Sequence, residues 1–106
     1  MSAGAYEFRF APEALDHLGA IERKHHGLIR RALDQQLGHM PLRETRNRKP
    51  LELPAPFGAS WEVRFGPGNR FRVFYGVDPD ARVVQILAIG VKEGNRLRIG
   101  GEEVET

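Results

Sequence analysis

Three arginines lie in two short segments in which apolar and charged residues alternate. The segments are residues 61–65 and 70–77, and the arginines are Arg64, Arg70 and Arg72. Guanidinium groups bind phosphate oxygens through paired hydrogen bonds and keep their charge at physiological pH. They are suited to stabilising the extra negative charge that develops when a phosphodiester is cleaved. RNA carries its own nucleophile, the 2′-hydroxyl, so its cleavage needs orientation, charge stabilisation and modest acid–base help but no metal ion.

Successive side chains of a β-strand point to opposite faces of the sheet, so residues two apart share a face. Glu62 shares a strand face with Arg64 and is a candidate general base, with a structural salt bridge to Arg64 or to a cross-strand arginine as the alternative. Phe74 shares a face with Arg72 and is a candidate for stacking on a base. Lys92 follows the next apolar strand and is expected, with Arg96 and Arg98, at the rim of this face. Further candidate RNA contacts are basic residues that flank the strands: Lys49, Arg70, Arg96 and Arg98.

These assignments have structural alternatives. The arginine row also suits a solvated sheet face or a face that receives an acidic peptide, and the basic run 43–49 also suits an exposed loop. His25 and His26 are adjacent, so on a helix their side chains diverge and cannot chelate one ion at the usual i, i+4 spacing. The chain has no cysteine. No metal site and no cofactor are therefore expected.

The elements that must position these residues follow from periodicity and turn residues. Pro12 suits the first position of a helix, and Gly38 suits a helix end. Residues 38–60 contain four prolines and are expected to be irregular. The expected elements are a strand at 6–10, helices at 12–19 and within 21–37, and strands at 61–65, 70–77, 83–89 and 95–99.

This order of elements predicts an α+β fold. An N-terminal strand and a two-helix hairpin precede a β-meander, so the helices are expected on one face of a mainly antiparallel sheet. Two helices cover only one face. The apolar residues of the alternating strands are then expected beneath the helices, and the arginines on the open face.

The bulk properties favour one domain spanning residues 1–106. No apolar run reaches the length of a membrane span and no secretion signal is visible, so we expect a cytoplasmic protein without membrane contact. Residues 43–98 carry eleven basic and six acidic side chains, a net charge of +5 that suits a polyanionic or acidic partner. The acidic tail 101–106 is expected to be flexible, with folding back onto the basic face as the alternative.

The alternating segments resemble the signature stretch of the RelE/ParE superfamily of bacterial toxins. The resemblance is carried by residues 61–65, 69–75 and 86–92, together with Asp78. In that family, an aromatic residue and an arginine in one strand precede a turn, an aromatic–arginine pair and a tyrosine. A hydrophobic strand then ends in glycine and a basic residue. Residues 49–51 and the helical hairpin are in register with this pattern, so the resemblance covers about residues 6–99.

The resemblance implies a toxin that a cognate antitoxin protein neutralises. Members of the RelE type cleave mRNA on the ribosome without a metal ion, and this activity is our leading expectation. By position, Arg64 and Arg72 match basic residues of the family's first two meander strands, and Lys92 matches the one after the glycine. Two features depart from those nucleases. Glu62 stands where many have a basic residue, and no tyrosine or histidine lies near the C-terminus.

Two alternatives keep the same fold and the same antitoxin partner. Members of the ParE type inhibit DNA gyrase and are not nucleases. A degenerate toxin fold would bind only its antitoxin. Neither alternative requires binding to mRNA or to the ribosome.

Overall fold

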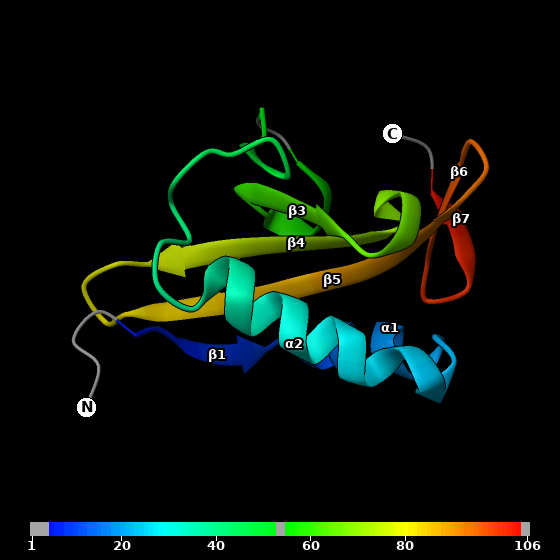
Figure 1. Cartoon of the computed structure of the whole chain (residues 1–106), viewed down its shortest axis with the longest axis horizontal. Coiled ribbons are helices and arrows are strands. Elements are labelled where there is room, and N and C mark those ends of the chain that lie inside the picture. Colours follow the sequence, from blue (N-terminus) through cyan, green and yellow to red (C-terminus); the bar gives the residue numbers. More distant parts are fainter. Residues whose placement is uncertain (1–4, 53–54, 105–106) are drawn as a thin grey trace.

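The alternating segments form the strands that their period predicts. The structure is a computed structural model that describes residues 5–52 and 55–104. Within these residues, seven strands form one sheet and two α-helices pack against it, so the predicted α+β fold class is confirmed (Figure 1). The strands are β1 (Glu7–Phe10), β2 (Arg48–Pro50), β3 (Trp61–Phe65), β4 (Phe71–Asp78), β5 (Val83–Glu93), β6 (Arg96–Ile99) and β7 (Glu102–Val104).

β5 is the central strand of the sheet, as its apolar composition predicts. The sheet order is β2-β3-β4-β5-β6-β7 with antiparallel neighbours, and β1 runs parallel to β5. One edge of β5 pairs with β4. The other edge is shared, because β1 pairs with the segment from Val83 to Ile86 and β6 with the segment from Gly90 to Glu93. Residues 87–89 lie between these two pairings, so their backbone groups on this edge need other partners.

The helices begin and end where the local sequence favours it. α1 (Pro12–Gly19) starts on its proline, whose fixed φ suits that position. α2 (His26–Leu37) follows the 3₁₀ turn η1 (Arg23–His25), so it starts later than residue 21. None of the described helices is long and apolar enough to cross a membrane.

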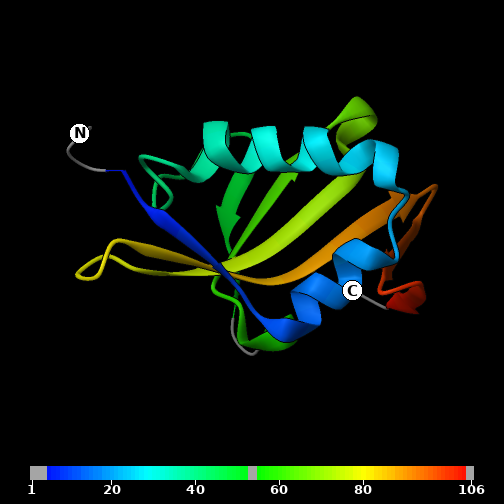
Figure 2. The ribbon, with the colours of Figure 1, turned by 90° about the horizontal axis from the view of Figure 1, so that it is seen from below.

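α2 lies along one face of the sheet and covers the main core (Figure 2). It buries Ile29, Leu33 and Leu37. Beneath it lie the apolar residues that alternation assigned to this face: Val63, Phe65, Phe71, Val73 and Tyr75. The face assignment for these strand residues is therefore confirmed.

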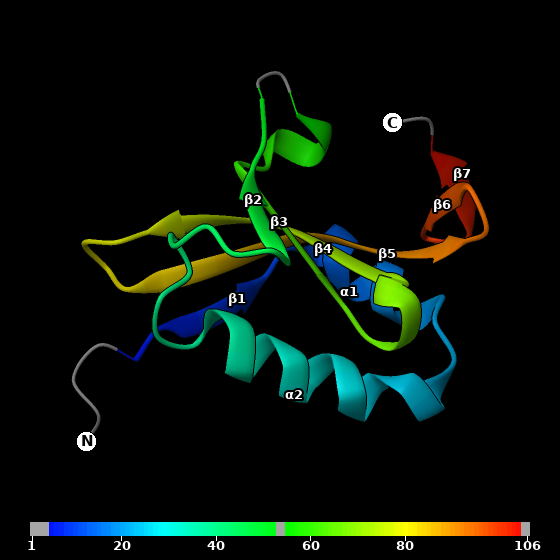
Figure 3. The same ribbon diagram turned by 45° about the horizontal axis from the view of Figure 1, so that its top comes forward.

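The opposite face of the sheet is partly covered, contrary to the prediction of an open face. The described part of the connection between β2 and β3, which contains the turn η2 (Pro56–Gly58), and the β6–β7 hairpin lie on the side away from α2 (Figure 3). They cover a smaller core formed by Ala59, Phe74, Ala88, Leu97 and Ile99. Alternation tells which residues share a face, but it does not tell which loops fold over that face.

The C-terminal segment also differs from the prediction of a flexible tail. Glu102–Val104 form β7, which pairs with β6. Val104 packs against the smaller core, and Glu103 Oε1 lies 3.8 Å from Arg96 Nε. The tail therefore folds back onto strand β6; residues 105–106 lie outside the described residues.

Gly90 of β5 lies beneath side chains of β6, and this packing gives a test of the covered face. A Cβ atom at position 90 would lie 2.9 Å from Ile99 Cγ1 and 3.0 Å from Leu97 Cδ1. Gly90→Ala is therefore expected to lower the free energy of unfolding by about 1–3 kcal/mol, as overpacking of a filled core does. Gly76→Ala is the matched control, because a Cβ there would meet Leu87 Cδ1 at an ordinary 3.9 Å. Equal urea midpoints for the two variants would contradict this packing.

Candidate nucleic-acid interface

Arg64 of β3 and Arg72 of β4 lie directly opposite each other on the sheet face away from α2. Like charges in such a cross-strand pair repel. Glu62 supplies the opposite charge between them. Its Oε1 accepts a hydrogen bond from Arg64 Nε at 2.9 Å, and its Oε2 lies 4.0 Å from Arg72 Nη1. The prediction that these three side chains share one face is therefore confirmed.

Arg72 is the more enclosed of the two arginines. Only 12% of its side-chain surface is exposed, against 35% for Arg64. Burial lowers the pKa of Arg72 below its ordinary value, and Arg64 lowers it further, while Glu62 raises it. Within the described part of the chain, the buried Nε of Arg72 has no hydrogen-bond partner. Among the same described residues the buried Nε of Arg48 is unpartnered as well, so it is the charge and the paired donors of the guanidinium that suit Arg72 to an anionic ligand.

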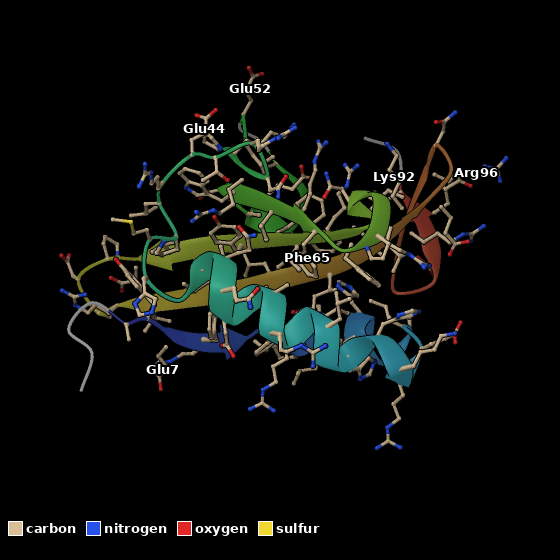
Figure 4. The ribbon with its side chains drawn as sticks, viewed as in Figure 1. Glu7, Glu44, Glu52, Phe65, Lys92 and Arg96 are labelled. Atoms are coloured by element: carbon tan, nitrogen blue, oxygen red, sulfur yellow. The ribbon has the colours of Figure 1, made fainter. Side chains whose placement is uncertain are left out.

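Two lysines add positive charge to the same face. Lys49 of β2 is exposed and stands directly opposite Glu62. Lys92 of β5 lies two residues past the cross-strand partner of Arg72, so it is a diagonal neighbour within reach of that side chain. Figure 4 shows Lys92 on the side of the sheet away from α2. We call this set the arginine surface: Lys49, Glu62, Arg64, Arg72 and Lys92.

Arg70 does not join the arginine surface, so its predicted place is wrong. It follows the turn η3 (Pro67–Asn69) in a helical conformation, with φ −71° and ψ −26°. The strand alternation therefore starts only at Phe71. The Arg70 guanidinium lies 5.3 Å from the centre of the Phe71 ring, which belongs to the core beneath α2.

Arg96 and Arg98 lie on the opposite face, so their predicted place at the rim of the arginine surface is also wrong. The short turn after β5 sets Glu93 opposite Arg96 and Val91 opposite Arg98. Directly opposite residues share a face, and Val91 belongs to the core beneath α2.

Phe74 is on the predicted face but is not available to a nucleic acid. Its side chain is 2% exposed and packs in the smaller core with Ala59 and Ala88. The connection between β2 and β3 covers it. The predicted stacking of Phe74 on a base is therefore wrong.

Arg48 has a structural role that the sequence did not reveal. It is buried in β2, and its Nη1 donates a hydrogen bond to the Met40 carbonyl oxygen. Nearby, the Tyr75 hydroxyl donates to the Pro41 carbonyl oxygen at 2.7 Å, and burial raises the pKa of Tyr75 well above its ordinary value. These bonds anchor the loop before β2. A three-residue strand within a basic run has too little periodicity to be predicted.

His17 of α1 fills the gap between the two pairings on the edge of β5. The Ile89 N–H donates to its Nδ1 at 3.3 Å, and its ring packs edge-on against Phe57 with 5.4 Å between centres. Burial lowers the pKa of His17 below its ordinary value, although Asp16 and Glu13 raise it. The neutral ring, with its proton on Nε2, is the form that accepts this bond.

The lowered pKa of His17 makes stability depend on pH. Its contribution is present above the unfolded value of 6.5 and is lost as the pH falls from there towards the lower folded pKa. Wild-type protein is therefore expected to lose more thermal stability than His17→Gln between about pH 7.5 and about pH 5. His39→Gln, at an exposed histidine, is the control and should follow the wild type. Parallel melting curves for wild type and His17→Gln would contradict this role.

A groove of about 510 Å³ lies between β1, α1 and α2, away from the arginine surface. Its lining is largely apolar and includes Phe8, Phe10, Leu15 and Leu18. The side chains of Phe10 and Leu15 are notably exposed, at 37% and 54%. Among the described strands β1 pairs only with β5, so its outer edge is free. An apolar groove beside a free strand edge is suited to binding a peptide segment.

Metal-ligand geometry does not occur among residues 5–52 and 55–104: no three histidine or carboxylate side chains there are placed to hold one ion.

Comparison with known proteins supports the fold assignment. No protein-family model and no curated protein sequence matches the chain. Among solved structures, the chain is similar to a chain of the toxin–antitoxin complex RelBE2 from Mycobacterium tuberculosis. The two share 23% sequence identity with a TM-score of 0.66, over 83% of this chain and 99% of that one. This similarity shows a shared fold across most of the chain.

Proposed function

We propose that this protein is the toxin of a type II toxin–antitoxin pair and that its arginine surface binds mRNA on the ribosome and promotes its cleavage. The observation that carries the proposal is the pair of opposed arginines, Arg64 and Arg72, held by one carboxylate on a strand face that also carries two lysines. The shared fold with a chain of a toxin–antitoxin complex supports the toxin role. Cytoplasmic location follows from a ribosomal target.

In this proposal each cation has a separate role. Arg72 binds the scissile phosphate and stabilises its developing charge. Arg64 offers its Nη groups to the same phosphate, since its Nε is bound to Glu62. Lys92 assists, and Lys49 contacts a neighbouring phosphate. The 2′-hydroxyl of the RNA is the nucleophile, so the reaction uses no cofactor.

RNA binding at different salt concentrations tests the proposal. Fluorescence anisotropy with a labelled single-stranded RNA in EDTA is expected to give a linear fall of log K with log salt. The two phosphates assigned above, the scissile one and its neighbour, predict a slope of roughly −1.4, at about −0.7 for each phosphate neutralised. A salt-independent affinity, or no binding by protein that is folded, would contradict the proposal.

The alternative function is inhibition of DNA gyrase without cleavage. Among the described residues, the arginine surface contains no histidine or tyrosine, and its one carboxylate is bound to an arginine. Proton transfer to and from the RNA would then have to rely on water or on the RNA itself. A protein that blocks supercoiling by purified gyrase and leaves mRNA intact would favour this function.

The groove between β1, α1 and α2 is the proposed contact for the antitoxin. It combines exposed apolar side chains with a free strand edge, and its lining includes one side chain of each charge, Arg30 and Asp34. An amphipathic segment with an apolar face matches this largely apolar surface. The groove is separate from the arginine surface.

A further inference from the structure

Glu62 is a buried carboxylate in the middle of a basic surface. The residue is 5% exposed, and its neighbours across the sheet are Lys49 on β2 and Phe74 on β4. Its two oxygens approach two different arginines, Arg64 at 2.9 Å and Arg72 at 4.0 Å. A single carboxylate therefore lies within ion-pair distance of both guanidinium groups.

We infer that Glu62 is a positioning residue that sets Arg64 and Arg72 side by side as one phosphate-binding unit. The two arginines are directly opposed, so without a shared counter-charge their guanidinium groups repel and turn apart. The bond from Arg64 Nε fixes the plane of that guanidinium and leaves its Nη groups free for a ligand. The identity of the ligand as a phosphate rests on the proposed function. The positioning of the two arginines by Glu62 does not depend on that function.

The contacts of Glu62 distinguish positioning from general-base catalysis. A general base must reach the proton that it removes, within hydrogen-bonding distance or through one water. Oε1 is bound to Arg64 Nε, Oε2 faces Arg72, and the side chain is almost fully enclosed. The enclosed carboxylate thus acts on the arginines and not on the substrate.

A positioning role and a simple counter-ion role predict opposite changes in RNA affinity when the charge of Glu62 is removed. Glu62→Gln raises the net charge of the surface by one unit, so a simple counter-ion reading expects tighter RNA binding. A positioning role expects weaker binding, by about tenfold, the effect of one well-oriented hydrogen bond to a charged group. Glu62→Asp keeps the charge but shortens the side chain, and it should weaken binding in the same direction.

Glu7→Gln is the matched control for charge. Glu7 and Arg9 form an ion pair at 3.4 Å with the same i, i+2 spacing on strand β1, but both side chains are about two-thirds exposed. This substitution adds the same charge away from the arginine surface. RNA affinity close to that of the wild type is expected for it.

The experiment combines RNA anisotropy with NMR of the arginine Nε–H groups in folded protein. The wild type is expected to show a slowly exchanging Arg64 Nε–H signal, which Glu62→Gln and Glu62→Asp lose while Glu7→Gln keeps it. Equal or tighter RNA binding by Glu62→Gln would overturn the inference, as would an unchanged Arg64 signal. Unchanged binding with lost cleavage would instead assign Glu62 as a base. If the wild type binds no RNA, the proposed function fails, and the NMR signal alone decides whether Glu62 holds the arginines.

Discussion

Replacing Arg72 with alanine is expected to abolish growth inhibition and to weaken RNA binding by at least about tenfold, or about 1.5–3 kcal/mol for a charged hydrogen-bonding group. The physical reason is the position of Arg72 in the arginine surface, directly opposite Arg64 and within ion-pair distance of Glu62. The slope of log K against log salt should fall by about 0.7, the value for one phosphate contact on a single strand. Toxicity in cells and RNA anisotropy measure the two effects.

Two control variants make this result specific. Arg98→Ala removes an arginine from the opposite face of the sheet, so it should keep nearly wild-type RNA affinity. Arg72→Lys keeps the charge but not the paired donors, so it should fall between wild type and Arg72→Ala. Urea unfolding of each variant checks that the fold is retained. Equal losses for Arg72→Ala and Arg98→Ala would show that RNA binding depends on overall charge and not on the arginine surface.

The second large effect is expected at the groove. Leu15→Asp places a charge on an exposed apolar side chain of the groove and should weaken antitoxin binding by about 2 kcal/mol or more, the loss typical of a central interface residue. Antitoxin co-expression would then no longer rescue growth, while toxicity itself would remain. The partner to use is a protein whose co-expression neutralises the wild-type chain.

Leu42→Asp is the matched control for the groove. Leu42 is 45% exposed, close to the value for Leu15, but it is not part of the groove lining. The variant should remain fully neutralised by the antitoxin. Neutralisation of Leu15→Asp at wild-type levels would remove the groove as the antitoxin site.

Local pattern was enough to predict the elements that carry the arginine surface. Period-two alternation in β3 and β4 placed Glu62, Arg64 and Arg72 on one face and the apolar residues beneath α2. Proline and glycine marked the start of α1 and the end of α2. These features depend on residues close together in the chain, and the sequence displays them directly.

The wrong predictions concern residues that lie outside a strand or beyond a turn, where the alternation of the preceding strand no longer applies. Arg70 belongs to the turn before β4, and Arg96 and Arg98 follow a hairpin whose register turns them to the other face. A shift of one residue moves every side chain of a strand to the opposite face. The two-residue turn after Glu93 sets the register of β6 on β5, and this register determines the face on which Arg96 and Arg98 lie.

Long-range packing accounts for what local pattern could not predict. Phe74 is buried because residues of the connection between β2 and β3, among them Ala59, pack against it, and residues 102–104 form a strand because β7 pairs with β6. Burial of Glu62 has the same origin, since its neighbours come from β2 and β4. The sequence therefore identified Glu62 as a residue of the site but left its role open.

The central claim is that the arginine surface acts on mRNA. Its most direct test is primer extension on mRNA from a translation reaction assembled from purified components, with wild-type protein and with Arg72→Ala. If the arginine surface acts on mRNA, new RNA ends within the reading frame are expected when wild-type protein and ribosomes are both present. With Arg72→Ala the mRNA is expected to stay intact. Intact mRNA with wild-type protein, together with inhibition of supercoiling by purified gyrase, would contradict the claim.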